Sequence, residues 1–291
     1  MHKAFKFYST FFFLLFQFLL SNGDKLNAST NRSDTSNRVS RVVALTSLSA
    51  DLVNNISNES LLGIPGSSLL KNNNDFSNKT VISSGRTPPN LEKIINLKPE
   101  LVIGSEGFHN KTLKSLEKLG IKTLSVRIAN FNDLEKLSSD IQILLDKKVK
   151  LDLENVIPNC YNLDKDIKTN KGKELLVLVS SKPILSPNSK SWAGNLINRF
   201  GYINLTSELD SKSQFKGYVN LSPEWLLSSK PSNLIIINTP GSDDSQYKQM
   251  SIWNDLPAVT NKRVFSFDYY GLINAGSLNS INKACQKLSS I

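Results

Sequence analysis

Histidine is almost absent from this sequence, which holds only His2 and His109 among its 291 residues. His2 lies in an N-terminal segment that we expect to be removed, so His109 would be the only imidazole of the mature chain. A histidine-rich site for free zinc or manganese is thereby excluded. A hydrolytic zinc centre and a Ser-His or Cys-His catalytic pair are disfavoured for the same reason, because each would depend on one residue.

Cysteine is equally scarce, with Cys160 and Cys285 alone. In an exported chain they would form one disulfide if the fold brings them together, or remain two buried free thiols. The sequence leaves both alternatives open. Neither cysteine lies near the N-terminus, so we expect no lipid anchor on cysteine there.

Long runs of like charge are also missing, although the formal net charge is +10. The lysines are scattered among Asp, Glu, Asn and Ser, which is typical of a solvated surface, and we expect no nucleic-acid partner. A net positive field would still favour an anionic ligand on approach.

The longest apolar run extends from Phe11 to Leu20, after Lys3 and Lys6. Such a run covers about 15 Å as a helix, half of a hydrocarbon core roughly 30 Å thick, so it indicates a secretory signal peptide rather than a membrane anchor. We predict residues 1–23 as the signal peptide, with Ala28 as an alternative cleavage position. Residues 24–38 are polar and aperiodic, which predicts a flexible leader.

Short apolar strands alternate with helical patterns along the rest of the chain. The predicted strands are residues 41–45, 101–104, 123–126, 175–179, 234–237 and 264–267, and the predicted helices include 111–119, 192–200 and 277–288. This alternation predicts parallel sheets covered by helices on both faces. Residues 133–170 show only helical spacing, which predicts a long helical connector that Pro158 interrupts.

One segment occurs twice. Residues 90–103, NLEKIINLKPELVI, are echoed by residues 222–235, SPEWLLSSKPSNLI. Each copy has a capping residue, a short helix with Glu in its first turn, and Lys-Pro before an apolar strand. We therefore predict an α/β fold of two similar lobes, residues 39–132 and 171–291. Each lobe would be a parallel sheet flanked by helices.

These residues resemble the periplasmic iron-complex and vitamin B12 binding family of ABC-importer receptors. The resemblance rests on residues 41–52, 61–64, 89–103, 116–121, 221–224, 230–231 and 253–265, in that order along the chain. It departs at Asp51, where the family more often has Glu, and in the loop 65–80, which is rich in Asn and Ser.

The resemblance implies a periplasmic solute-binding protein, not an enzyme, that holds no resident metal or cofactor. Its ligand would be a metal chelate, such as a ferric siderophore, haem or a cobalamin-type corrinoid, delivered to the permease dimer of an ABC importer. It would meet the membrane only through that permease. A secreted adaptor of the same fold that binds a protein partner is the alternative, followed by an enzyme.

The resemblance places the ligand cleft between the two lobes, and loops after the carboxyl ends of the strands should form its surface. By position they nominate eleven residues: Arg86, Ser105, Phe108, His109, Arg127, Ser186, Trp192, Phe215, Tyr218, Tyr269 and Tyr270. Arg86 would pair with a carboxylate or catecholate, and the two adjacent tyrosines would stack on a flat macrocycle. His109 is a candidate axial ligand, and Trp192 is alternatively a core residue.

Glu92 and Glu224 occupy the same place in the two copies of the repeated segment. By resemblance they match the acidic residues with which family members dock on arginines of the permease dimer. Their structural role is to place negative charge at the positive end of a helix. That role accounts for each glutamate separately but does not predict a matched pair. Docking on a two-fold permease, in contrast, requires one glutamate on each lobe.

Overall fold

The computed structural model describes residues 38–84, 87–148, 150–210, 213, 215–239 and 245–291. The predicted signal peptide, and all of the predicted leader except Arg38, lie outside these residues. None of the helices within them is long and apolar enough to cross a bilayer.

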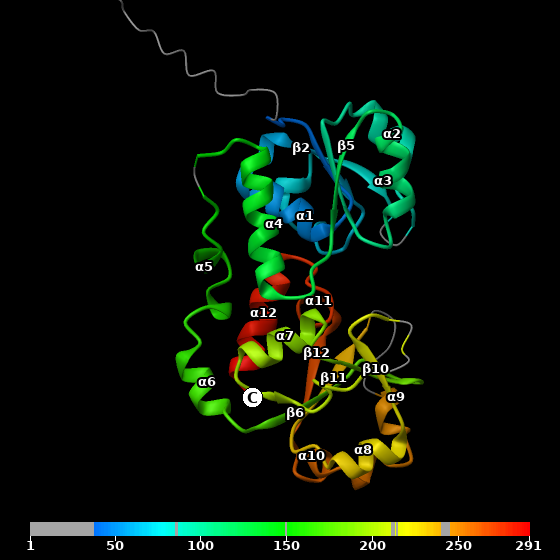
Figure 1. The fold of residues 1–291 in the computed structure, drawn as a ribbon, viewed down its shortest axis with the longest axis vertical. Helices are drawn as coiled ribbons and strands as arrows, with labels where there is room; N and C mark the ends of the chain where they lie inside the picture. The colour runs from blue at the N-terminus through cyan, green and yellow to red at the C-terminus, as the bar shows by residue number, and fades with distance from the viewer. Residues whose placement is uncertain (1–37, 85–86, 149, 211–212, 214, 240–244) are drawn as a thin grey trace, which may run out of the picture. The chain divides into compact units, whose positions relative to one another are not determined.

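In the described part of the first lobe, five parallel strands form a sheet in the order β3-β2-β1-β4-β5 (Figure 1). They are β1 (Val42–Ala44), β2 (Leu61–Pro65), β3 (Thr80–Ser83), β4 (Leu101–Ser105) and β5 (Lys122–Val126). The helices and 3-10 turns are α1 (Ser47–Ser57), η2 (Asn58–Ser60), η3 (Asn74–Phe76), α2 (Leu91–Asn96) and α3 (Asn110–Glu117). The predictions of β1, β4 and β5 are confirmed. The sequence analysis missed β2, which contains Gly63 and Pro65, and the half-exposed edge strand β3.

In the second lobe, the described residues form a parallel sheet and a smaller antiparallel one. The parallel sheet has the order β12-β11-β6-β9, with β6 (Glu174–Leu178), β9 (Ile203–Asn204), β11 (Leu234–Asn238) and β12 (Val264–Asp268). The antiparallel sheet has the order β10-β8-β7, with β7 (Ser180–Ser181), β8 (Ile184–Pro187) and β10 (Tyr218–Leu221). The helices and the 3-10 turn are α7 (Trp192–Arg199), α8 (Pro223–Ser229), α9 (Ser245–Lys248), η5 (Trp253–Asp255), α10 (Pro257–Thr260), α11 (Tyr269–Leu272) and α12 (Leu278–Ser289). The antiparallel sheet was not predicted, because its strands are short and lack a clear apolar alternation.

The two repeated segments fold alike. The side chain of Asn90 accepts a hydrogen bond from the N–H of Lys93 at 2.9 Å, and Ser222 accepts one from the N–H of Trp225 at 3.2 Å. The helices α2 and α8 therefore start in the same way. Both segments then pass through a lysine in the left-handed conformation, with φ of 47° at Lys98 and 44° at Lys230, before Pro and the strands β4 and β11.

The connecting helix is α4 (Phe131–Leu144), which begins two residues before the predicted connector at 133. The rest of the segment is not one helix but α5 (Leu153–Val156), the 3-10 turn η4 (Pro158–Cys160) and α6 (Asp164–Asn170). The chain leaves α4 through Asp146, at φ 50°, and Pro158 opens η4. A left-handed residue ends one helix, and a residue without an N–H starts the next turn.

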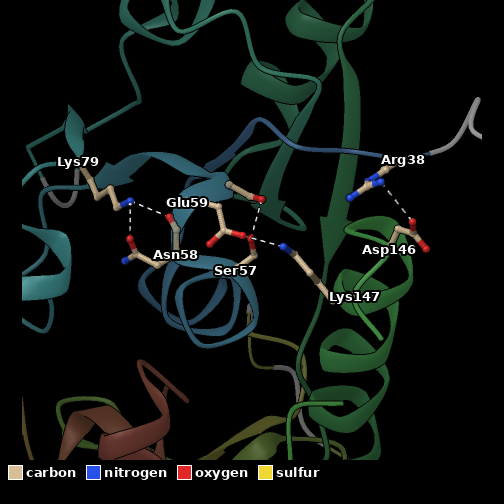
Figure 2. Close-up of polar contacts among 8 residues, drawn as sticks. Arg38, Ser57, Asn58, Glu59, Lys79, Asp146 and Lys147 are labelled. Atoms are coloured by element: carbon tan, nitrogen blue, oxygen red, sulfur yellow. Dashed lines mark hydrogen bonds and ion pairs between the residues drawn. The ribbon is translucent and has the colours of Figure 1, made fainter. Parts of the chain in front are cut away.

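Polar contacts attach the C-terminal end of α4 to the first lobe (Figure 2). Lys147 Nζ lies 2.7 Å from Glu59 Oε1, and Arg38 Nη1 lies 3.7 Å from Asp146 Oδ2. At the other end of α4, the N–H of Phe131 donates to Asn195 Oδ1 of α7 at 2.9 Å. The helix is therefore bonded to the second lobe at its N-terminal end and to the first lobe at its C-terminal end.

A disulfide joins Cys160 in η4 to Cys285 in α12, across a sequence separation of 125. Both residues are fully buried, in the apolar core that α4, α7 and α12 share with the two parallel sheets. The alternative of two free thiols is therefore excluded. The bond ties the segment after α4 to the last helix of the second lobe.

Candidate functional site

A cavity of about 790 Å³ is bounded by residues of both lobes, and we call it the main cavity. Its walls are the loops that follow β1, β2, β3, β4 and β5, together with Trp192 and the segment after α11. The lining residues are Leu45, Thr46, Ser47, Leu48, Ser49, Pro65, Gly66, Ser67, Ser68, Ser84, Ser105, Phe108, His109, Val126, Ile128, Leu137, Trp192, Tyr270, Ile273, Asn274, Ala275 and Gly276. Its size lies within the range of small-molecule sites.

The N-terminus of α1 forms one wall of the main cavity. The chain turns from β1 into α1 at Thr46, whose Oγ1 accepts from the N–H of Ser49 at 3.1 Å. The N–H groups of Ser47 and Leu48, in the first turn, have no partner within the helix. This wall therefore presents hydroxyls and the positive end of a helix dipole.

His109 lies at the start of α3, against the end of β4. The backbone N–H of Ser105 points at His109 Nδ1 at 3.0 Å, and Ser105 Oγ lies 2.9 Å from the same nitrogen. A backbone N–H can only donate, so Nδ1 is the acceptor and the ring proton is on Nε2. Burial lowers the pKa of His109 below its ordinary value of 6.5, which favours the neutral ring.

Trp192 lines the main cavity and is only 3% exposed. Its Nε1 donates to the carbonyl oxygen of Gly271 at 2.8 Å, and its ring stacks on Phe131 at 6.2 Å between centroids. The guanidinium of Arg199 lies 4.0 Å from the centre of the Phe131 ring and donates to the carbonyl oxygen of Cys160. Trp192 is thereby packed against Phe131, the first residue of α4.

Five of the eleven nominated residues line the main cavity: Ser105, Phe108, His109, Trp192 and Tyr270. Both alternatives for Trp192 hold, since it is a buried residue that also faces the cavity. Phe108 is 62% exposed, so its ring lies at the rim.

The other nominees lie elsewhere. Arg86 falls outside the described residues. Arg127, Phe215, Tyr218 and Tyr269 are described but are not among the residues that line the main cavity. Ser186 is fully buried in β8, with its Oγ 3.1 Å from Thr206 Oγ1, which is an interior position.

The loop Pro65 to Ser68 lines the main cavity and contains no nominated residue, and two further lining segments were missed by the sequence analysis. The first is Thr46 to Ser49, from which no residue was nominated although the segment follows the carboxyl end of β1. The rule applied to the other strands would have identified it. The second is Asn274 to Gly276, after α11, for which the sequence holds no pattern.

A second cavity of about 780 Å³ lies next to the first, and we call it the side cavity. It is bounded by Asp51 of α1, by the loop between β2 and β3, and by α12 with Lys283 and Lys287. Ser68 and Tyr270 line both cavities, so they form part of the wall between them.

Residues 42–144 and 161–270 match the sequence profile of the family described as periplasmic binding protein. The match covers most of the chain and both lobes. The chain belongs to the periplasmic binding protein family.

Relatives and solved structures agree with this membership. The uncharacterized ABC transporter substrate-binding lipoprotein YvrC of Bacillus subtilis is 24% identical over 206 residues, 65% of this chain and 61% of the relative. A possible iron-binding (periplasmic solute-binding) protein from Staphylococcus epidermidis superposes with a TM-score of 0.70 at 20% identity, covering 87% of this chain and 98% of that one. The vitamin B12 binding protein BtuF of Vibrio cholerae gives 0.60 at 16% identity, covering 87% and 97%. At these identities, the structural likeness concerns the fold.

In this periplasmic binding protein, the two repeated glutamates are exposed on corresponding helices. Glu92 lies in the first turn of α2 and Glu224 in the first turn of α8. A hydrogen bond from Ser222 lowers the pKa of Glu224, so this carboxylate is ionised at neutral pH. Around Glu92, the side chains of Leu91 and Ile95 are 36% and 40% exposed.

Proposed function

We propose that this chain is an extracytoplasmic solute-binding protein that captures a metal chelate and delivers it to an ABC importer. The observation that carries the proposal is the main cavity, a space of about 790 Å³ bounded by both lobes in a member of the periplasmic binding protein family. Hydroxyls, one imidazole and aromatic faces share its walls. Such a mixture suits an organic molecule with both polar and apolar surface.

Export is supported by two features of the chain. The N-terminal apolar run has the length of a signal peptide, and the disulfide between Cys160 and Cys285 is typical of proteins that fold in an oxidising compartment. The relative YvrC carries the name lipoprotein. In this chain both cysteines are used in the disulfide, and we propose a periplasmic or extracellular location.

Docking on the permease is assigned to Glu92 and Glu224. They are exposed, they start equivalent helices, and each lobe carries one. A two-fold symmetric partner requires such a pair. The exposed Leu91 and Ile95 would add apolar contact beside the first of them.

Ligand binding is tested by titrating the purified protein with a ferric trihydroxamate, hemin and cyanocobalamin. Trp192 lines the main cavity, so its fluorescence should be quenched by a bound chelate. We expect saturable binding of one of them at micromolar or lower concentration. A folded protein that binds none of the three would contradict the proposal and favour the adaptor alternative.

Docking is tested with the double variant Glu92→Lys/Glu224→Lys. We expect chelate affinity within a factor of two of wild type and no stimulation of the transporter ATPase, because like charges would then meet. The matched control is Asp164→Lys/Asp166→Lys, which makes the same charge change in the first turn of α6. If both double variants fold and stimulate the ATPase equally, the docking assignment is wrong.

A further inference from the structure

His109 is a buried titratable residue, and only one of its ring nitrogens is hydrogen-bonded to the part of the chain that the structure describes. The residue is 5% exposed and lines the main cavity. Its Nδ1 is bonded to Ser105, and both hydrogen bonds of the ring to described residues are made by this nitrogen, none by Nε2. The Nε2–H group is therefore free for a bound molecule.

The ring is held firmly in this position. A Cβ placed on Gly104 would lie 3.0 Å from His109 Cβ, so glycine permits the close approach of the side chain to β4. The ring of Phe108 packs edge-on against the imidazole, with centroids 4.8 Å apart. Together with the Ser105 hydrogen bond, these contacts define both the place of the ring and its tautomer.

We propose that His109 is a fixed neutral hydrogen-bond donor, which presents Nε2–H to an oxygen atom of the bound molecule. The first turn of α1, with the N–H groups of Ser47 and Leu48, lines the same cavity, and these groups also donate. The chemistry that fits is a chelate whose metal is already fully coordinated by its own donor atoms and whose edge carries carbonyl or carboxylate oxygens. This inference rests on the proposed function and restricts the class of metal chelates that the protein would bind.

Axial ligation of a metal by His109 is incompatible with this tautomer. A neutral imidazole that binds a metal through Nε2 must carry its proton on Nδ1. Here that proton would face the N–H of Ser105, 3.0 Å away, and two donors would meet without an acceptor. A haem that depends on an imidazole from this protein is therefore disfavoured.

Two variants separate the two bonds of His109: the inner bond, from the N–H of Ser105 to Nδ1, and the proposed outer bond, from Nε2–H to the bound molecule. His109→Asn keeps an oxygen acceptor for the Ser105 N–H but lacks the outer donor. His109→Gln places an amide N–H₂ near the position of Nε2 but gives up the inner acceptor. For a ferric trihydroxamate, we expect His109→Asn to bind about tenfold more weakly with little change in melting temperature, and His109→Gln to bind within about threefold of wild type.

The tautomer is measured independently of any ligand. In full-length protein labelled with ¹⁵N-histidine, the ring signals come from His2 and His109, and the His109→Asn spectrum assigns them. We expect protonated Nε2 and unprotonated Nδ1. An Nδ1–H tautomer, unchanged affinity in His109→Asn, or a hemin spectrum that depends on His109 would each overturn the inference. Failure of wild-type protein to bind any of the three chelates would instead overturn the proposed function, and the ligand assignment with it.

Discussion

The carboxylate of Asp51, in the first lobe, accepts a hydrogen bond from the backbone N–H of Leu278, in the second, with 2.8 Å between Oδ2 and N. Leu278 is the first residue of α12, whose local cap is Ser277. The helix therefore has one cap from its own chain segment and another from a residue 227 positions away. Asp51 connects the two lobes and also lines the side cavity.

Removal of the Asp51 acceptor should destabilise the protein. We expect Asp51→Ala to lower the free energy of unfolding by about 1 to 2 kcal/mol, the usual cost of losing a helix cap. Asp51→Asn keeps an oxygen acceptor, so its free energy of unfolding should fall by less. Urea denaturation of the two variants beside wild type checks this order, and equal losses would show that the hydrogen bond to Leu278 contributes nothing.

The pH dependence of Asp51→Asn has a definite sign. Burial raises the pKa of Asp51 above its ordinary value of 3.8, against the lowering effect of the Leu278 hydrogen bond. The folded state thus favours the protonated carboxyl, and that stabilisation is complete below pH 3.8 and is lost as the pH rises through the folded-state pKa. The stability of Asp51→Asn minus that of wild type should therefore be more favourable to the variant at pH 7 than at pH 4. Melting curves at both values test this, and a constant difference would contradict it.

The disulfide should account for a large part of the stability. Replacing Cys160 and Cys285 together by serine should lower the free energy of unfolding by about 2 to 5 kcal/mol, because the unfolded chain regains the freedom of a long loop. Wild-type protein in reducing buffer should unfold at about the same urea concentration as the double serine variant. The unfolding of the double variant itself should not change when the reductant is added. Unchanged unfolding of the reduced wild type would refute the prediction.

Arg199 should be hard to replace even by lysine. Its planar guanidinium stacks on Phe131 and donates to the carbonyl oxygen of Cys160, two roles that an ammonium group fills poorly. We expect Arg199→Lys to cost about 1 to 2 kcal/mol of stability. A double-mutant cycle with Phe131→Leu should give a coupling of about 0.5 to 2 kcal/mol. Additive losses would mean that the stacking contributes no stability.

The two ends of α4 predict limited motion between the lobes. One end is bonded to Asn195 of α7, and the other is paired with Glu59 of the first lobe through Lys147. A helix held at both ends does not provide a hinge, so ligand binding should change the radius of gyration little. X-ray scattering with and without a bound chelate tests this, and a contraction of several ångströms would rule it out.

Local patterns in the sequence were sufficient for several elements of the fold, but not for β2, β3 or the antiparallel sheet. The apolar runs of β4, β6 and β11 were predicted because each is a buried parallel strand, and the caps Asn90 and Ser222 because a cap acts within three residues. The similarity of the two repeated segments was predicted from the same local rules. The left-handed backbone that Lys98 and Lys230 share was not predicted and is a finding of the structure.

Only the tertiary structure decided which of these residues meet. Tyr269 and Tyr270 are neighbours after one strand, yet only Tyr270 lines the main cavity, because adjacent residues point in different directions and the packing of α11 selects between them. The pairing of Cys160 with Cys285 and the contact of Asp51 with Leu278 join residues more than a hundred positions apart. No local pattern encodes such contacts, since they depend on the direction in which whole elements pack. The same holds for the tautomer of His109. The sequence analysis left this residue as a candidate metal ligand, whereas the backbone N–H of Ser105 fixes the tautomer in which Nε2–H is a donor.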